Sequence, residues 1–187
     1  MGAAVVSPAW FPRLPSSARS TGAFPAGEGW FVVNTRDARW LDFGELGLAC
    51  FFESKSAPFD QLGINLNVLR PGEPSCMYHG EDAQEDFVVL VGECILIVEG
   101  QERSLRTWDF VHCPPWTEHV FVGAGDGPCL LLAVGHREKG RGLRYPMNAT
   151  ALKHGAGVET ETSDPNEAYA RYGELKPVPC PDQFPGD

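Results

Sequence analysis

The chain has 187 residues, of which 43% are hydrophobic, and its formal net charge is -10. This length is enough for one well-buried domain and is short for two. An excess of acidic residues does not suit a surface that must neutralise phosphates, so we expect no nucleic-acid partner. No apolar run approaches the roughly 20 residues that span a bilayer, and the first residues lack a basic start and a long apolar centre. We therefore expect a soluble, cytoplasmic protein without a membrane partner.

Six cysteines are scattered along the chain without a C-x-x-C pair. A domain of this size does not need disulfide bonds to be stable, so we expect reduced thiols. The cysteines are Cys50, Cys76, Cys94, Cys113, Cys129 and Cys180.

The segments before residue 70 differ sharply in composition. Residues 1–29 are rich in Pro, Ser, Gly and Ala, which predicts a flexible arm or an over-extended translation start. Residues 30–33 and 48–52 are apolar and aromatic, and we expect both to form outer strands. In residues 64–69, apolar side chains alternate with Asn65 and Asn67, which predicts a half-buried strand.

The middle of the chain consists of short β-prone runs separated by glycine turns. Gly92 and Gly100 mark two of these turns. Close spacing of short strands without long helical periodicity predicts an all-β antiparallel sandwich or barrel. The predicted strands span residues 87–91, 94–98, 104–106, 110–113, 119–122 and 129–134.

Helix signals are restricted to the last forty residues. Asp164 is a candidate N-cap, followed by Pro165 at the first helical position and by Glu167, and we expect a helix that runs on through residues 168–172. A second short helix is predicted from about residue 147 to 154, with Gly155 as its C-terminal stop.

Four side chains form a candidate metal site. His79 and Glu81 are two residues apart, so they leave the same face of an extended segment, and Glu85 lies close enough to turn back toward them. His119 supplies a distant second imidazole. Imidazoles with carboxylates suit a divalent transition metal such as iron, manganese, nickel or zinc. Two alternatives stay open: the acidic residues form a solvated loop, or Gln84 replaces one Glu as the oxygen donor.

The order of these residues resembles the cupin superfamily, whose two motifs run G-x5-H-x-H-x3-E-x6-G and G-x5-P-x-G-x2-H-x3-N. The resemblance covers about residues 72–123 and keeps the spacing between the matched positions. Those positions are occupied by His79, Glu85, Gly92, Pro114 and His119.

Several positions depart from the cupin pattern. Glu81 stands in place of the second His, and Gly72 lies one residue further from His79 than the motif has it. Trp108 and Trp116 replace two glycines, and Gly123 replaces the final Asn. A large Trp116 side chain next to the turn before His119 would either narrow the pocket mouth or cover the loop.

The resemblance implies a double-stranded β-helix, or jelly-roll, barrel over residues 30–145, with motifs at 72–92 and 108–123. Short helices and a tail follow over residues 146–187. It also implies a divalent metal, a small-molecule ligand or substrate, and a homodimer. A metal-dependent enzyme of oxygenase type is slightly favoured. The alternatives are an isomerase, decarboxylase or hydrolase, or a non-catalytic binding or sensing barrel.

Some residues near the motifs have a simpler interpretation than chemistry. Tyr78 points away from the site if its strand is regular, so we expect it to pack in the core. We interpret Cys113 as a buried thiol and His112 as a structural hydrogen-bonding residue.

Overall fold

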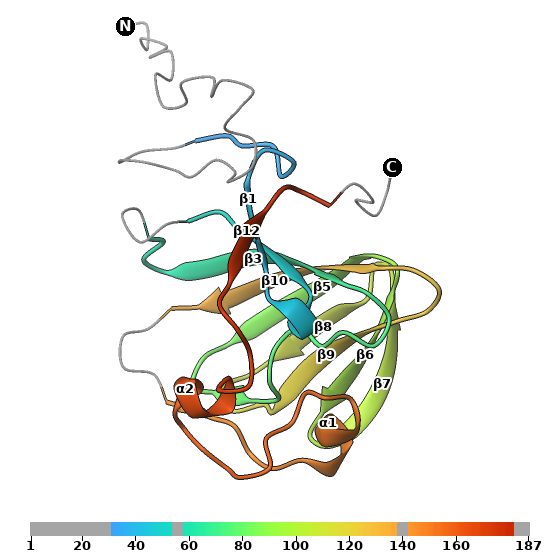
Figure 1. Ribbon diagram of the computed structural model, residues 1–187, viewed down its shortest axis with the longest axis vertical. Helices are drawn as coiled ribbons and strands as arrows, with labels where there is room; N and C mark the ends of the chain where they lie inside the picture. Colours follow the sequence, from blue (N-terminus) through green and yellow to red (C-terminus); the bar gives the residue numbers. More distant parts are fainter. Residues whose placement is uncertain (1–30, 54–57, 138–141, 182–187) are drawn as a thin grey trace, which may run out of the picture.

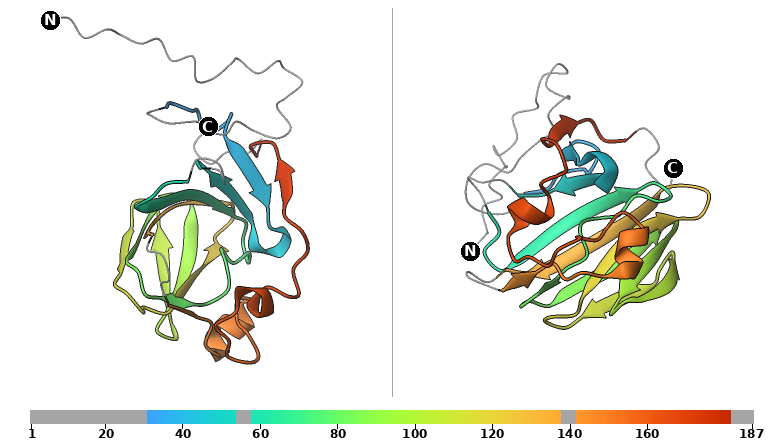
Figure 2. Two further views of the ribbon diagram at one scale, coloured as in Figure 1. Left: turned by 90° about the vertical axis from the view of Figure 1, so that its left-hand side faces the viewer. Right: turned by 60° about the horizontal axis from the view of Figure 1, so that its bottom comes forward.

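The computed structural model describes residues 31–53, 58–137 and 142–181. The predicted arm, residues 1–29, lies outside this part of the chain. Antiparallel strands curve round into a barrel, which confirms the expected jelly-roll class (Figures 1 and 2). A seven-stranded sheet of order β12-β1-β2-β3-β10-β5-β8 faces a three-stranded sheet of order β7-β6-β9. The large sheet contains β1 (Arg39–Asp42), β2 (Leu48–Phe51), β3 (Leu62–Leu69), β5 (Glu85–Val91), β8 (Phe110–Cys113), β10 (Cys129–His136) and β12 (Lys176–Val178).

The smaller sheet closes the opposite side of the barrel. A further pair of two-residue strands, β4 and β11, joins the loop before β5 to the chain that follows β10. The remaining strands are β4 (Gly80–Glu81), β6 (Glu93–Val98), β7 (Gln101–Arg106), β9 (His119–Ala124) and β11 (Leu143–Arg144).

Two hydrophobic clusters hold the large sheet from its two faces. On the inner face, side chains such as Phe87, Phe121 and Leu131 are buried between the two sheets. On the outer face, Trp40 is fully buried among side chains that include Cys50. Burial of a large aromatic side chain stabilises the fold by several kcal/mol, as the cost of about 3–5 kcal/mol for removing one shows. Both faces of the β2–β3 region are therefore covered.

The first predicted strand is wrong, because residues 31–33 are not in a strand. The outer strand forms later, at β1, where Trp40 supplies the buried aromatic group. Phe31 instead stacks on Phe59, with 6.3 Å between the ring centroids. The other strand predictions agree with the structure within a few residues, and all six cysteines are free thiols.

Both expected helices are present but short. α1 (Ala149–Lys153) begins after Asn148, whose side chain accepts hydrogen bonds from two backbone amides. α2 (Pro165–Ala168) begins after the predicted cap Asp164 and ends before Tyr169, so it does not run on through residue 172. Both lie at the end of the molecule away from the β1–β12 edge (Figure 1). Beyond them, β12 returns to pair with β1, which adds a strand to the segment where only helices and a tail were expected.

Candidate metal centre

His79 and His119 face each other across a short antiparallel pairing. The amide of His119 donates to the His79 carbonyl at 2.8 Å, and the amide of His79 donates to the His119 carbonyl at 3.2 Å. Directly opposed residues of an antiparallel pair place their side chains on the same face. The two imidazole rings accordingly lie with their centroids 5.0 Å apart.

Glu85, the first residue of β5, completes the cluster. Its Oε2 lies 3.4 Å from Nε2 of His119 and 3.7 Å from Nε2 of His79. One potential ligand atom from each of the three residues lies within 4.8 Å of the others. The two Nε2 atoms and one carboxylate oxygen thus converge on a single point from three separate elements of the barrel.

Backbone carbonyls hold both imidazoles in the same tautomer. Nδ1 of His79 lies 2.9 Å from the carbonyl oxygen of Met77, and Nδ1 of His119 lies 2.9 Å from that of Thr117. A carbonyl only accepts, so each Nδ1 carries the proton and donates it. Each Nε2 therefore points toward Glu85, which is the orientation of a metal-binding histidine.

The two rings differ in how readily they take a second proton. Burial, followed by the charge of His79, lowers the pKa of His119 to about 3, so this ring is neutral at pH 7. Burial also disfavours the charged form of His79, but the neighbouring thiol of Cys76 and the Glu85 carboxylate outweigh it and raise the pKa of His79 to about 10. In the metal-free cluster the proton is therefore held by His79, and a bound metal would displace it.

The cluster opens into a cavity of about 270 Å³ inside the barrel. Its walls combine aromatic rings with a few polar groups and with two small residues on the strands that flank β3. None of the described residues that line it is Lys or Arg. Besides the cluster, the lining includes Phe43, Phe51, Phe87, Phe121, Asn65, Asn67, Ser75, Cys76, Tyr169, Ala49 and Ala133.

Glu81 and Gln84 are not part of the three-residue cluster. Glu81 is buried in β4 near Tyr145, whose pKa is raised mainly by burial and to a smaller extent by the Glu81 carboxylate. Gln84 is exposed and donates to Asp86, so it does not face the cluster as an oxygen donor. The site residues gathered by the fold are His79, Glu85 and His119.

The sequence analysis did not single out the other polar residues of the cavity. Asn65 and Asn67 alternate with apolar residues, a pattern that usually places the polar face in solvent. Here the apolar face packs under β1 and β2, which turns both amides into the barrel. Tyr169 also lines the cavity, and its hydroxyl accepts a hydrogen bond from the Met77 amide at 3.1 Å. One signal in the sequence could have indicated this orientation. The apolar segment that forms β1 and β2 must cover another apolar surface, and the apolar face of β3 provides it.

Other residues near the motifs agree with their simpler interpretation. Tyr78 is fully buried, and its hydroxyl donates to Glu118. Cys113 is buried, and His112 lies 2.6 Å from the Asp86 carboxylate. Trp116 is not among the residues that line the cavity.

The two tryptophans at motif glycine positions keep a conformation that favours glycine. Their φ angles are +75° at Trp108 and +69° at Trp116. Trp116 covers the neighbouring loop, where its ring lies against Gly142 and the Arg144 guanidinium is 5.6 Å from its centroid. The backbone path of the motif is therefore retained although the glycines are not.

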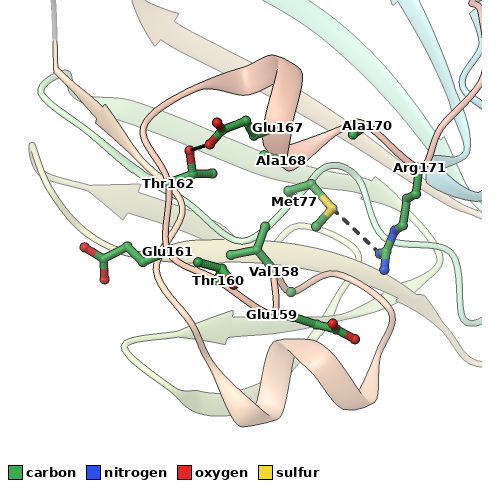
Figure 3. Close-up of a pocket in the computed structure, with 11 residues that line it drawn as sticks. Met77, Val158, Glu159, Thr160, Glu161, Thr162, Glu167, Ala168, Ala170 and Arg171 are labelled. Carbon is green, nitrogen blue, oxygen red and sulfur yellow. Dashed lines mark hydrogen bonds between the residues drawn. The ribbon is translucent and has the colours of Figure 1, made fainter.

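A second pocket, of about 430 Å³, lies outside the barrel beside α2 (Figure 3). The side chains of Glu159 and Glu161 point in different directions, and Glu167 is engaged by Thr162. Arg171 contacts the sulfur of Met77, the residue whose carbonyl orients His79. This pocket therefore lies behind the residue that orients His79 and brings no acidic groups together.

Comparison with known proteins identifies the central part of the chain. A family model described as "Cupin domain" matches residues 65–135, the stretch that contains the whole cluster. A gentisate 1,2 dioxygenase 1 from Aquipseudomonas alcaligenes is 27% identical over 117 residues. That match covers 60% of this chain and 31% of the dioxygenase, so the chain spans about a third of the length of this relative.

Solved structures agree on the fold. The polyketide cyclase RemF from Streptomyces resistomycificus has a TM-score of 0.51 and 15% identity, over 59% of this chain and 81% of that one. An RmlC-like cupin from Shewanella frigidimarina has a TM-score of 0.51 and 15% identity, over 60% of this chain and 95% of that one. Within the described residues, no helix combines the length and hydropathy needed to cross a membrane. The family model therefore assigns a cupin domain to residues 65–135, and these solved structures share the fold of its barrel.

Proposed function

We propose that this cupin is a divalent-metal-dependent enzyme of oxygenase type that acts on a small molecule. The observation that carries the proposal is the convergence of His79, Glu85 and His119 on one point of a cavity lined by aromatic side chains. The proposed ligand atoms are Nε2 of each histidine and a carboxylate oxygen of Glu85. Glu81 is proposed only as an additional carboxylate near the site.

The donor set fits a divalent transition metal. Both histidines are buried or nearly so, are oriented by backbone carbonyls, and direct their Nε2 atoms at the Glu85 carboxylate. Two imidazoles and one carboxylate on one side of an ion are the ligands typical of non-haem iron(II) oxygenases. The chemistry that iron supplies in such a set is the activation of dioxygen beside a bound substrate.

The residues of the chain then supply binding and protection. Phe87 and Phe121 pack against the His119 ring, which fixes it in place and keeps bulk water from that side of the cluster. The similarity to a gentisate dioxygenase supports an oxygenase over the other cupin chemistries. The alternative is isomerisation, decarboxylation or hydrolysis on zinc or manganese, or a barrel that binds a ligand without catalysis.

Metal analysis of untagged, chelator-free protein tests the proposal. We expect near-stoichiometric iron by inductively coupled plasma mass spectrometry, and its loss in His79→Ala and His119→Ala while circular dichroism shows an intact barrel. Glu81→Ala is the matched control, because it removes a buried carboxylate outside the cluster and should retain the metal. Metal retained in His119→Ala would contradict the ligand assignment.

The identity of the metal then separates the alternatives. Iron-loaded protein should consume oxygen with a small phenol or diol, measured with an oxygen electrode. Stoichiometric zinc, manganese or nickel without oxygen uptake would favour an isomerase, decarboxylase or hydrolase. Protein that takes up no added metal would favour the binding barrel.

We also propose that the protein is a homodimer. Trp108 is 76% exposed and Phe110 63% exposed, and both lie at β8, an edge strand of the large sheet. Neighbouring exposed aromatic side chains on an open edge suit burial against a second copy. Analytical ultracentrifugation should give a dimer for the wild type and a monomer for a Trp108→Ser, Phe110→Ser double variant. A monomeric wild type would refute the proposal.

A further inference from the structure

One buried polar atom in the cavity has no protein partner. Oδ1 of Asn65 is buried in β3 and accepts no hydrogen bond from any residue that the structure describes. A buried acceptor without a partner is costly, so it is rare unless a bound molecule satisfies it. The side chain lines the same cavity as the metal cluster.

Strand register places Asn65 two strands away from the strand that carries Glu85, on the same inner face of the large sheet. Asn65 pairs with Ala133 of β10, and Ala133 pairs with Phe87 of β5. Glu85 precedes Phe87 by two residues and therefore lies on the same inner face, level with Gly135. At about 4.8 Å between neighbouring strands, the Asn65 backbone lies about 10 Å from that of Phe87.

Small side chains on β10 leave space between Asn65 on β3 and Glu85 on β5. Ala133 and Gly135 are the inward-facing residues that separate Asn65 from the Glu85 side of the cavity. Larger residues there would fill the gap, whereas these leave room for a molecule that touches both the cluster and Asn65. Polar contacts at its two ends and aromatic walls between them suit a small ring.

The charge of the cavity lining limits the class of ligand that the cavity can bind. Its described lining contains no Lys or Arg, so a metal bound by the cluster would supply the positive charge. One metal can balance a single carboxylate but leaves a phosphate dianion poorly neutralised. The four phenylalanine rings of the lining favour an apolar or aromatic body.

We propose that Asn65 selects the substrate by accepting a hydrogen bond from a hydroxyl group on a small ring compound whose anionic group lies at the metal cluster. This inference rests on the proposed metal-dependent function and adds the substrate class and the residue that recognises it. A ring compound without this hydroxyl group would leave Oδ1 of Asn65 without a hydrogen bond. The cost of that unpaired acceptor would make the hydroxylated ring the preferred ligand.

Binding of paired probes tests the inference. Full-length protein loaded with Mn²⁺ is titrated calorimetrically with benzoate and with its 3-hydroxy and 4-hydroxy derivatives. In the wild type, at least one hydroxybenzoate should bind about 10-fold more tightly than benzoate, the gain expected for satisfying a buried acceptor. In Asn65→Leu the ratio of the two affinities should fall to about one, because the acceptor of the hydroxyl group has been removed.

Asn67→Leu is the matched control, because it makes the same change on the same inner face, two residues further along β3. It should keep the wild-type ratio. An unchanged ratio in Asn65→Leu, an equal loss in Asn67→Leu, or a wild type that binds Mn²⁺ but none of the hydroxybenzoates would overturn the assignment. Metal content measured on the same samples identifies a failure of the metal site itself.

Thermal stability provides a second readout that does not depend on the probe. Without a ligand, Asn65→Leu should melt about 2–4 °C above the wild type, because the unpaired acceptor is gone. A residue kept for structure would show the opposite change. A lower Tm in Asn65→Leu would therefore overturn the proposal even if binding were also lost.

Discussion

Filling the barrel cavity from Ala133 should stabilise the protein while blocking the site. Ala133 faces the interior of the barrel between Asn65 and Phe87, and the cavity beside it measures about 270 Å³. Ala133→Leu adds three carbon atoms, each worth about 0.8 kcal/mol when buried, and costs about 0.5–1 kcal/mol in side-chain entropy. The expected net gain is about 1.5 kcal/mol, or a Tm higher by roughly 3–6 °C.

Urea denaturation monitored by tryptophan fluorescence measures this gain, and titration with hydroxybenzoate measures the loss of binding. Metal content should not change, because the three cluster residues are on other segments. The reasoning would be refuted by a loss of 1 kcal/mol or more, since overpacking of this kind would show that the space at Ala133 is not open. Retained probe binding in a stabilised variant would equally contradict the placement of the substrate.

Three further predictions concern stability. Trp116→Gly should lower the urea midpoint of unfolding, because the contacts of the Trp116 ring with Gly142 and the Arg144 guanidinium are lost, and an unchanged midpoint would contradict this packing role. Asn148→Ala should cost about 1 kcal/mol, because the Asn148 side chain accepts from two amides at the start of α1, and an unchanged midpoint would contradict this capping role. Burial, with a smaller effect of Cys180, raises the pKa of Cys50 from 9.0 to about 12, so the associated stability is complete below pH 9 and is lost as pH rises toward 12. Cys50→Ala, although less stable at pH 7, should therefore lose less stability than the wild type between pH 9 and pH 12. Equal losses of unfolding free energy in the two proteins would refute the raised pKa of Cys50.

Motif spacing was sufficient to predict that His79, Glu85 and His119 meet in one cluster. His79 and Glu85 are separated by one turn, and His119 is returned to them by the β6–β9 sheet, so regular strand geometry brings all three together. Glu81 shares the spacing argument but not the position. Glu81 lies in β4, which pairs with β11. The spacing of residues along the chain does not predict this local pairing.

The orientation of β3 could not be predicted from its own residues. Alternation of Asn65 with Leu66 indicates two different faces but does not tell which face is internal. That is decided by β1 and β2, which cover the apolar face with Trp40 and Cys50. The decision is made by segments distant in sequence, and a polar-in arrangement becomes favourable only once the outer face has a partner.

The pairing of Trp40 with Val178 has a consequence for biosynthesis. β1 is among the first described segments to leave the ribosome, and β12 is among the last. Contacts between distant segments must await the slow closure of a long loop, so the outer edge of the large sheet is completed only after β12 has been translated. Until then β1 presents an unpaired edge to other nascent chains, and truncation before Lys176 would make that exposure permanent.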